Sequence, residues 1–179
     1  MTNKATQLSQ NEVERAIFAS GCFWGIDHHM RRMPGVIKTE VGYTGGKTNN
    51  PTYREVCTGQ TGHAEAIEVH FRPSEVSFEQ LAILFFETHD PTQVDRQGPD
   101  IGTQYRSEIF YLNPAQKETA DRLIRVLEEK GDVIATRVTA AAAFWVAEEH
   151  HQDYYEKNGQ TPHCHVYQRR FESLLKTRA

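Results

Sequence analysis

Residues 21–25, with the sequence GCFWG, place one cysteine among glycine and aromatic neighbours. Cys22 follows a short apolar run and precedes a segment that can form a helix, so its thiol is expected at a helix N-terminus. The unpaired N–H groups and the dipole of a helix N-terminus favour a thiolate. Glycine on either side lets backbone and substrate approach closely. Cys22 is therefore a candidate nucleophile, the alternative being a small buried residue in a strand–helix turn.

The elements that must position this thiol alternate between strands and helices. Strands are predicted at residues 13–19, 36–43, 64–71, 107–112 and 133–140, and the strand at 64–71 is expected to be half-buried. Helices are predicted at 23–32, after Ser77, from 114 to near 131, and at 147–157, with Ser77 and Gln80 forming a capping box. This order predicts an α+β fold, a two-layer α/β sandwich around a mixed, mostly antiparallel sheet with a ferredoxin-like core.

Length and composition indicate one domain. The 179 residues suit a single hydrophobic core, expected at 11–165, with a flexible tail at 1–10 and a C-terminal tail at 166–179. A net charge of -4 argues against nucleic acid as a partner. No apolar run is long enough to cross a membrane and no secretory signal precedes the core, so we expect a cytoplasmic monomer. Three cysteines are too few for a disulfide scaffold or a four-cysteine zinc site.

The motif around Cys22 is the first of a series of short motifs along the chain. In this order they resemble the A-type peptide-methionine sulfoxide reductases, and the resemblance spans roughly residues 13–165. The matching segments are GCFWG at 21–25, VGYTGG at 41–46, PTY at 51–53, VCTG at 56–59, TGHAE at 61–65, HDPTQ at 89–93, RQG at 96–98, Asp100, GTQYRS at 102–107, AE at 147–148, HQ at 151–152 and Tyr154. The resemblance implies an oxidoreductase that reduces the S epimer of methionine sulfoxide, free or in proteins, and so repairs oxidative damage.

The reaction implied by this resemblance needs a nucleophile and an acid. The Cys22 thiolate would attack the sulfoxide and take its oxygen, which leaves a sulfenic acid on the cysteine. Glu65 would be the general acid, provided that burial or a negative neighbour raises its pKa. Without the resemblance, Glu65 would read as a glutamate on the solvent side of its strand.

The resemblance also implies the residues that surround the sulfoxide. Tyr53 and Tyr105 would each donate a phenolic hydrogen bond to its oxygen, and Asp100 would orient this group. Phe23 and Trp24 would contact the substrate methyl group. Taken singly, each of these aromatic side chains could equally fill core or edge positions.

Recycling of the sulfenic acid calls for a second thiol. Cys164 is the resolving candidate, because it lies in a polar tail segment after Lys157-Asn158, and a Cys22–Cys164 disulfide would then be reduced by thioredoxin. Direct attack on Cys22 by thioredoxin or a small thiol is the alternative. Cys57 is expected to pack as a small hydrophobic residue close to the site. No cofactor and no metal are expected.

Three other functions compete with this interpretation. A metal-binding protein is suggested by the runs His28-His29, His150-His151 and His163-Cys164-His165, although adjacent side chains point to different faces and no zinc motif is present. A cysteine hydrolase could pair Cys22 with His63, but the aromatic neighbours and the lack of a hydrolase signature argue against it. A non-catalytic binding module is the third alternative.

Overall fold

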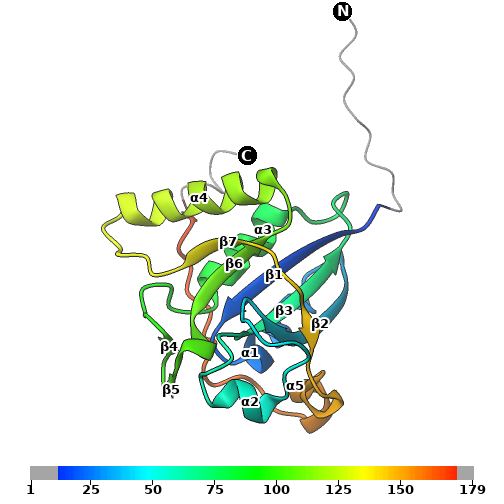
Figure 1. Ribbon diagram of the computed structural model, residues 1–179. Helices are drawn as coiled ribbons and strands as arrows, with labels where there is room; N and C mark the ends of the chain where they lie inside the picture. Colours follow the sequence, from blue (N-terminus) through cyan, green and yellow to red (C-terminus); the bar gives the residue numbers. More distant parts are fainter. Residues whose placement is uncertain (1–11, 173–179) are drawn as a thin grey trace, which may run out of the picture.

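The computed structural model describes residues 12–172, in which helices pack against a six-stranded sheet (Figure 1). The strand order is β7-β6-β1-β3-β2-β8, and a separate two-stranded sheet joins β4 and β5. The strands are β1 (Glu14–Ser20), β2 (Val36–Thr44), β3 (Ala64–Phe71), β4 (Arg96–Gln97), β5 (Asp100–Ile101), β6 (Ser107–Tyr111), β7 (Arg137–Ala140) and β8 (Trp145–Val146). The helices are α1 (Phe23–Met30), α2 (Tyr53–Cys57), α3 (Phe78–Glu87), α4 (Pro114–Glu129) and α5 (Tyr154–Asn158), with 3-10 turns η1 (Thr103–Tyr105) and η2 (Glu149–His151).

The centre of the sheet confirms the predicted fold class. Strands β6, β1, β3 and β2 are neighbours and pair antiparallel, and β7 adds to β6 in parallel. With α1 between β1 and β2, and α3 between β3 and β6, the chain has the βαββαβ order of ferredoxin-like folds. Helices α2 and α5 and the β4–β5 hairpin gather at one end of this sheet, at the bottom of Figure 1.

Strand β3 is buried on both faces, which corrects the expectation of a half-buried strand. Ile67 lies in the main core cluster, which includes side chains of α1, α3 and α4. Because side chains alternate along a strand, Glu65 faces the same helical layer as Ile67. The opposite face is covered as well, since Ala66 belongs to a second cluster against which Phe144 packs. Glu65 is therefore only 2% exposed, and Glu68 only 7%.

The predicted helix starts are confirmed by their caps. The Ser77 hydroxyl accepts the Gln80 amide N–H, and the Gln80 side chain accepts the Ser77 N–H in return, which completes a capping box. At α4, Asn113 accepts the Gln116 N–H and Pro114 occupies the first turn, where it has no N–H to leave unpaired. These caps depend on side chains within three residues of each other, which a sequence motif specifies directly.

The single helix predicted at residues 147–157 is wrong. The segment forms η2 and then α5, with Asp153 in the left-handed region at φ 55° between them. The edge of β2 causes the break. The Val41 carbonyl accepts the Ala147 N–H, and the Gln152 side chain bonds both the N–H and the carbonyl of Val41. Pairing with β2 thus replaces the hydrogen bonds that a continuous helix would need.

Two further segments differ from the expected boundaries. The strand predicted from residue 133 begins only at Arg137, because the Ala135 N–H donates to the Pro91 carbonyl outside the sheet. Residues 166–172, expected in a C-terminal tail, return to the core: Phe171 is fully buried, and its N–H donates to the Glu87 carboxylate. Helix α2 and the β4–β5 hairpin were not predicted, and both carry residues of the site described below.

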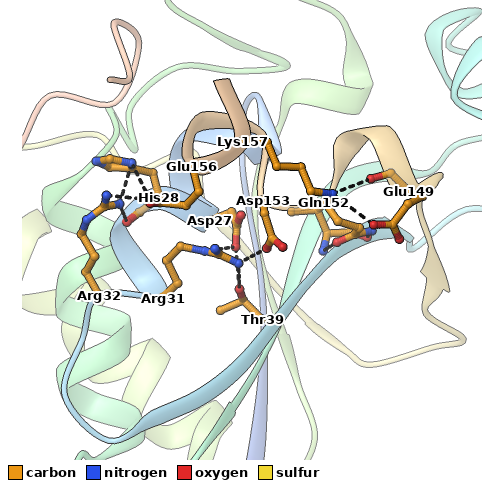
Figure 2. A network of polar contacts seen from close by, with 11 residues as sticks. Asp27, His28, Arg31, Arg32, Thr39, Glu149, Gln152, Asp153, Glu156 and Lys157 are labelled. Carbon is orange, nitrogen blue, oxygen red and sulfur yellow. Dashed lines mark hydrogen bonds and ion pairs between the residues drawn. The ribbon is translucent and has the colours of Figure 1, made fainter. Parts of the chain in front are cut away.

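A polar network fixes the C-terminal segment to α1. Figure 2 shows the Arg31 guanidinium between Asp27 of its own helix, Thr39 of β2 and Asp153 at the start of α5. Asp27 is buried, and burial raises the pKa of its carboxyl, whereas hydrogen bonds from Thr39 and Arg31 oppose that rise. On the surface side, Glu156 of α5 pairs with Arg32, which follows the C-cap of α1. Side-chain contacts, rather than a sheet ladder, therefore dock α5 onto α1.

Within residues 12–172, none of the helices has the length and apolar character that crossing a bilayer requires.

Candidate active site

The predicted nucleophile lies at the junction between β1 and α1. Cys22 is the N-cap residue of α1, and the nearby backbone N–H of Trp24 acts to lower the pKa of its thiol. Gly21 before it has φ 91°, and a Cβ at this position would lie 2.5 Å from Cβ of Gln97. A glycine is needed there on both counts. The tight turn presents the thiol at the helix N-terminus, as the sequence predicts.

The cavity beside Cys22 brings together the predicted reaction and substrate residues. Its volume is about 100 Å³. A group of a few heavy atoms fits inside. The lining residues are Cys22, Phe23, Trp24, Tyr53, Glu65, Asp100 and Tyr105.

Glu65 has the environment that a general acid needs. Its carboxylate accepts the N–H of Phe23 at 3.1 Å, which ties β3 to the first turn of α1. Burial, with smaller contributions from the charges of Asp100 and Cys164, raises the pKa of Glu65 to about 8, although the Phe23 N–H opposes this shift. At neutral pH the carboxyl is therefore mostly protonated and can donate a proton into the cavity.

Two phenols and a second carboxyl complete the polar wall. Burial raises the pKa of Tyr105 to about 12 and raises that of Tyr53 further, so both hydroxyls keep their protons and can donate hydrogen bonds. Burial also raises the pKa of Asp100 on β5, and the charge of Cys164 adds to the rise. The geometry supplies donors for a developing negative oxygen.

Cys57 does not pack as a buried hydrophobic residue, which corrects the sequence expectation. It is the last residue of α2 and is exposed, because that helix is a single short turn at the molecular surface. It does lie beside the site, where a hydrogen bond between the Cys57 thiol and Tyr53 contributes to the raised pKa of the phenol.

Cys164 lies next to Cys22 although it does not line the cavity. The neighbouring Cys164 thiol, together with burial and the Glu65 charge, raises the pKa of Cys22. The interaction with Cys22, assisted by His165, lowers the pKa of Cys164. Both directions run against the sequence argument, which placed the thiolate on Cys22. All three cysteines are free thiols.

Three further residues of the site belong to the family-matching segments, but the sequence alone suggested no role for them. The ring of Tyr154 stacks on Trp24 with centroids 3.7 Å apart and an angle of 4° between the planes. His151 accepts the indole N–H of Trp24 at 3.2 Å, and Glu148 accepts the backbone N–H of Tyr53 at 3.0 Å. Their regular spacing of three residues could have marked them as a group in the sequence. However, that spacing predicts three side chains on one face of a helix. The broken segment instead wraps these side chains around the aromatic wall.

The histidines behind the rival functions serve other purposes. His63 accepts the Gly46 N–H and bonds the Thr48 carbonyl, so both ring nitrogens hold a loop and neither reaches the cavity. Within residues 12–172, the side chains close enough to share a metal ion are Glu40, Glu68 and His70, and none of the predicted histidine runs belongs to that group. Cys164 and His165 do face each other, contrary to the expectation that adjacent side chains diverge.

Comparisons with known proteins point in one direction. The family model described as peptide methionine sulfoxide reductase matches residues 14–178. The peptide methionine sulfoxide reductase MsrA of Acidobacterium capsulatum is 53% identical over 85% of this chain and 99% of its own length. That of Methanoculleus marisnigri is 48% identical over 84% and 93%.

Solved structures give the same result. Mxr1 from Saccharomyces cerevisiae in reduced form aligns with a TM-score of 0.83 and 33% identity, covering 92% of this chain and 97% of the other. Methionine sulfoxide reductase A of Corynebacterium diphtheriae aligns with a TM-score of 0.76 and 39% identity, covering 87% and 80%. Mxr1 in complex with Trx2 has the same fold at 24% identity and a TM-score of 0.61, covering 92% and 96%.

Proposed function

The chain belongs to the peptide methionine sulfoxide reductase family, and from this premise we propose that the cavity beside Cys22 is where it reduces methionine sulfoxide. The observation that carries the proposal is that seven residues from five elements, which are α1 with its N-cap, α2, β3, β5 and η1, line one cavity of about 100 Å³. The cavity suits the sulfoxide tip of a methionine side chain, because it is small and has both apolar and hydrogen-bonding walls. The rest of the substrate would stay outside, so free and protein-bound methionine sulfoxide could both enter.

The first step is oxygen transfer to Cys22. The Cys22 thiol releases its proton to solvent, and the Cys22 thiolate attacks the sulfoxide. The S–O bond of the substrate breaks and a Cys22 S–O bond forms, so methionine sulfur is reduced by two electrons and Cys22 is oxidised to a sulfenic acid. Glu65 supplies a proton to the oxygen, since its raised pKa keeps it protonated at neutral pH.

The walls of the cavity orient the sulfoxide for this step. Tyr53 and Tyr105 donate hydrogen bonds to the oxygen, where negative charge develops. Asp100 keeps the polar side in place, and Phe23 and Trp24 hold the methyl group. The cavity selects one sulfoxide epimer, because the oxygen must face the hydroxyl groups while the methyl group faces the aromatic rings. Family membership favours the S epimer.

The second step regenerates the thiol. Cys164 attacks the sulfenic sulfur of Cys22, a disulfide forms, and water leaves. Support comes from the reduced state, in which Cys164 lies close enough to Cys22 for each thiol to shift the pKa of the other. A thioredoxin-like dithiol would then reduce the disulfide. Mxr1, 33% identical to this chain, has been solved in complex with Trx2.

The setting of the enzyme follows from the same chemistry. We infer a monomer in the cytoplasm, where thioredoxin keeps cysteines reduced. Sedimentation of the reduced protein tests the oligomeric state, and fractionation of cells tests the location.

A single comparison of two proteins tests the proposed reaction. Purified wild type and Cys22→Ser are incubated with a methionine sulfoxide peptide and dithiothreitol, and methionine is followed by chromatography. We expect methionine from the wild type and none from the variant, because a hydroxyl cannot replace the thiolate as nucleophile. Equal formation of methionine by both proteins would move the reaction away from Cys22.

A further inference from the structure

His165 lies in a position that the proposed reaction has not yet used. His165 is only 2% exposed, and its ring fills a pocket between the end of β1 and the first turn of α1. One ring nitrogen, Nε2, lies 2.8 Å from the carbonyl oxygen of Ser20. The other, Nδ1, lies 3.2 Å from Sγ of Cys164. The imidazole therefore bridges a fixed backbone carbonyl and the candidate resolving thiol.

The partners fix the tautomer of this ring. A carbonyl oxygen can only accept a hydrogen bond, so Nε2 of His165 must carry the hydrogen that it donates to Ser20. In the neutral imidazole Nδ1 is then unprotonated and accepts from the Cys164 thiol. A nucleophile paired with a base that a third group orients is the arrangement by which enzymes activate cysteine.

The structure around the ring preserves this geometry. A Cβ at Gly25 would lie 2.0 Å from Nδ1 of His165, so the second glycine of the GCFWG motif leaves the space that the imidazole occupies. The His29 ring donates through Nε2 to the His165 carbonyl at 2.9 Å, which holds the backbone of the segment. Both contacts tie the resolving segment to the helix that carries Cys22.

We propose that His165 is the general base of the resolving step, a role that rests on the proposed function of Cys164. As the Cys164 sulfur attacks the sulfenic sulfur of Cys22, its thiol proton passes to Nδ1 of His165. The S–S bond forms and the S–O bond of Cys22 breaks. The departing hydroxyl takes up the proton and leaves as water, so one sulfur is oxidised, the other reduced, and His165 returns to its neutral form.

No other titratable group described near Cys164 is placed to accept its thiol proton in the resolving step. Glu65 is assigned to the first step, and Cys22 is the sulfur under attack. Tyrosine and carboxylate neighbours affect Cys164 through charge alone, whereas His165 has a ring nitrogen at hydrogen-bond distance. The groups that act electrostatically on the Cys164 sulfur, besides His165, are Cys22, His29, Glu65, Asp100 and Tyr155.

The test separates the two steps in a single turnover. Reduced full-length protein is mixed with excess methionine sulfoxide peptide and no other reductant. Methionine is measured by chromatography, sulfenic acid by dimedone addition and disulfide by intact mass. The proteins are wild type, His165→Gln, Cys164→Ser and His163→Gln, the last a matched control because His163 is the exposed histidine on the other side of Cys164.

We expect one equivalent of methionine from every protein at a similar rate, which also shows that each site is folded. At pH 7, disulfide formation should be about 100-fold slower in His165→Gln, which is within the range of general-base catalysis. It should be unchanged in His163→Gln and absent in Cys164→Ser. Disulfide formation at the wild-type rate in His165→Gln would overturn the role of His165. Turnover of Cys164→Ser with thioredoxin at the wild-type rate would instead overturn the proposed function of Cys164.

A pH series distinguishes a base from a structural support. In His165→Gln the rate of disulfide formation should rise with pH and approach the wild-type rate above about pH 8.5, where a free thiol ionises without help. A deficit of the same size at every pH would mean that His165 only positions Cys164, and would overturn the proposal.

Discussion

Two regions meet at the active site, and they are held together in different ways. Cys22 and Glu65 belong to the half built from β1, β3 and α1, where continuous ladders pair β3 with β1 on one side and with β2 on the other. Residues 147–171 form the other half, which has only short helical turns and whose residues 161–166 are in neither helix nor strand. Side chains such as Gln152 and Glu87 hold it in place.

The difference matches the two tasks of the site. Oxygen transfer needs reacting groups held within a fraction of an ångström, which a hydrogen-bonded sheet and its helix provide. A resolving thiol must reach Cys22 and afterwards present a disulfide to another protein. Cys164 lies between two anchors, the Trp24–Tyr154 stack and the buried Phe171. A segment fixed at both ends and without ladders in between can open locally at lower cost than the sheet.

Replacing the resolving thiol should have the largest effect on this comparison. Cys164→Ser is expected to lose steady-state turnover with thioredoxin and to keep one full equivalent of methionine in a single turnover, because only the second half of the site is altered. Thioredoxin-coupled NADPH oxidation and burst amplitude measure the two quantities. A reduced burst would show that the two halves are not separable.

Replacing the acid should slow the first step in the ordered half. Glu65→Gln is expected to lower the single-turnover rate by about 100-fold, since a positioned acid typically contributes that much or more. Wild-type activity should fall as pH rises through about 8, where Glu65 loses its proton, and the Gln variant should lack this limb. An unchanged profile in the variant would assign the acid to another group.

The pH dependence of protein stability gives an independent test of the raised pKa of Glu65. A folded-state pKa raised from 4.5 to about 8 means that the buried charge destabilises the fold. The wild type should therefore lose stability relative to Glu65→Gln as pH rises from 4.5 to about 8, with no further change above that. Thermal unfolding of both proteins across this range measures the difference, and parallel curves would contradict it.

Removing the Gln152 side chain, which holds the C-terminal half against β2, should affect that half alone. Gln152→Ala removes three hydrogen bonds and leaves the Val41 N–H without its partner, at an expected cost of about 1–3 kcal/mol. Lys157→Ala, which removes only exposed contacts with the side chain and the carbonyl of Glu149, is the control and should cost less than about 1 kcal/mol. Hydrogen exchange should show faster opening of 147–166 in the first variant. Equal acceleration in β3 would show that the halves unfold together.

The smallest effect is expected at the third cysteine. Cys57→Ser should keep both steps at wild-type rates, because the residue is exposed and serine retains a group that can hydrogen-bond Tyr53. Single-turnover and thioredoxin-coupled assays check this. A loss confined to thioredoxin turnover would give Cys57 a part in the exchange of thiols.

Much of the molecule follows from the sequence alone. The strands around β1 and β3, the capping box at Ser77 and Gln80, and the cysteine at the start of α1 all depend on neighbours within a few residues. Hydrophobic period and side-chain caps are local properties, so a single sequence states them. The resemblance to the reductase family likewise depended on residue identity, and the comparisons bear it out.

Only the tertiary structure decided how these parts behave together. The helix expected at 147–157 breaks because Val41, more than 100 positions away, offers hydrogen bonds that compete with it. Glu65 becomes an acid because both faces of β3 are covered, which a strand pattern does not state. Cys164 and His165 converge because Gly25 leaves room for the ring. Local sequence fixes what each residue is next to along the chain, whereas burial and proton positions depend on partners that only folding brings into contact.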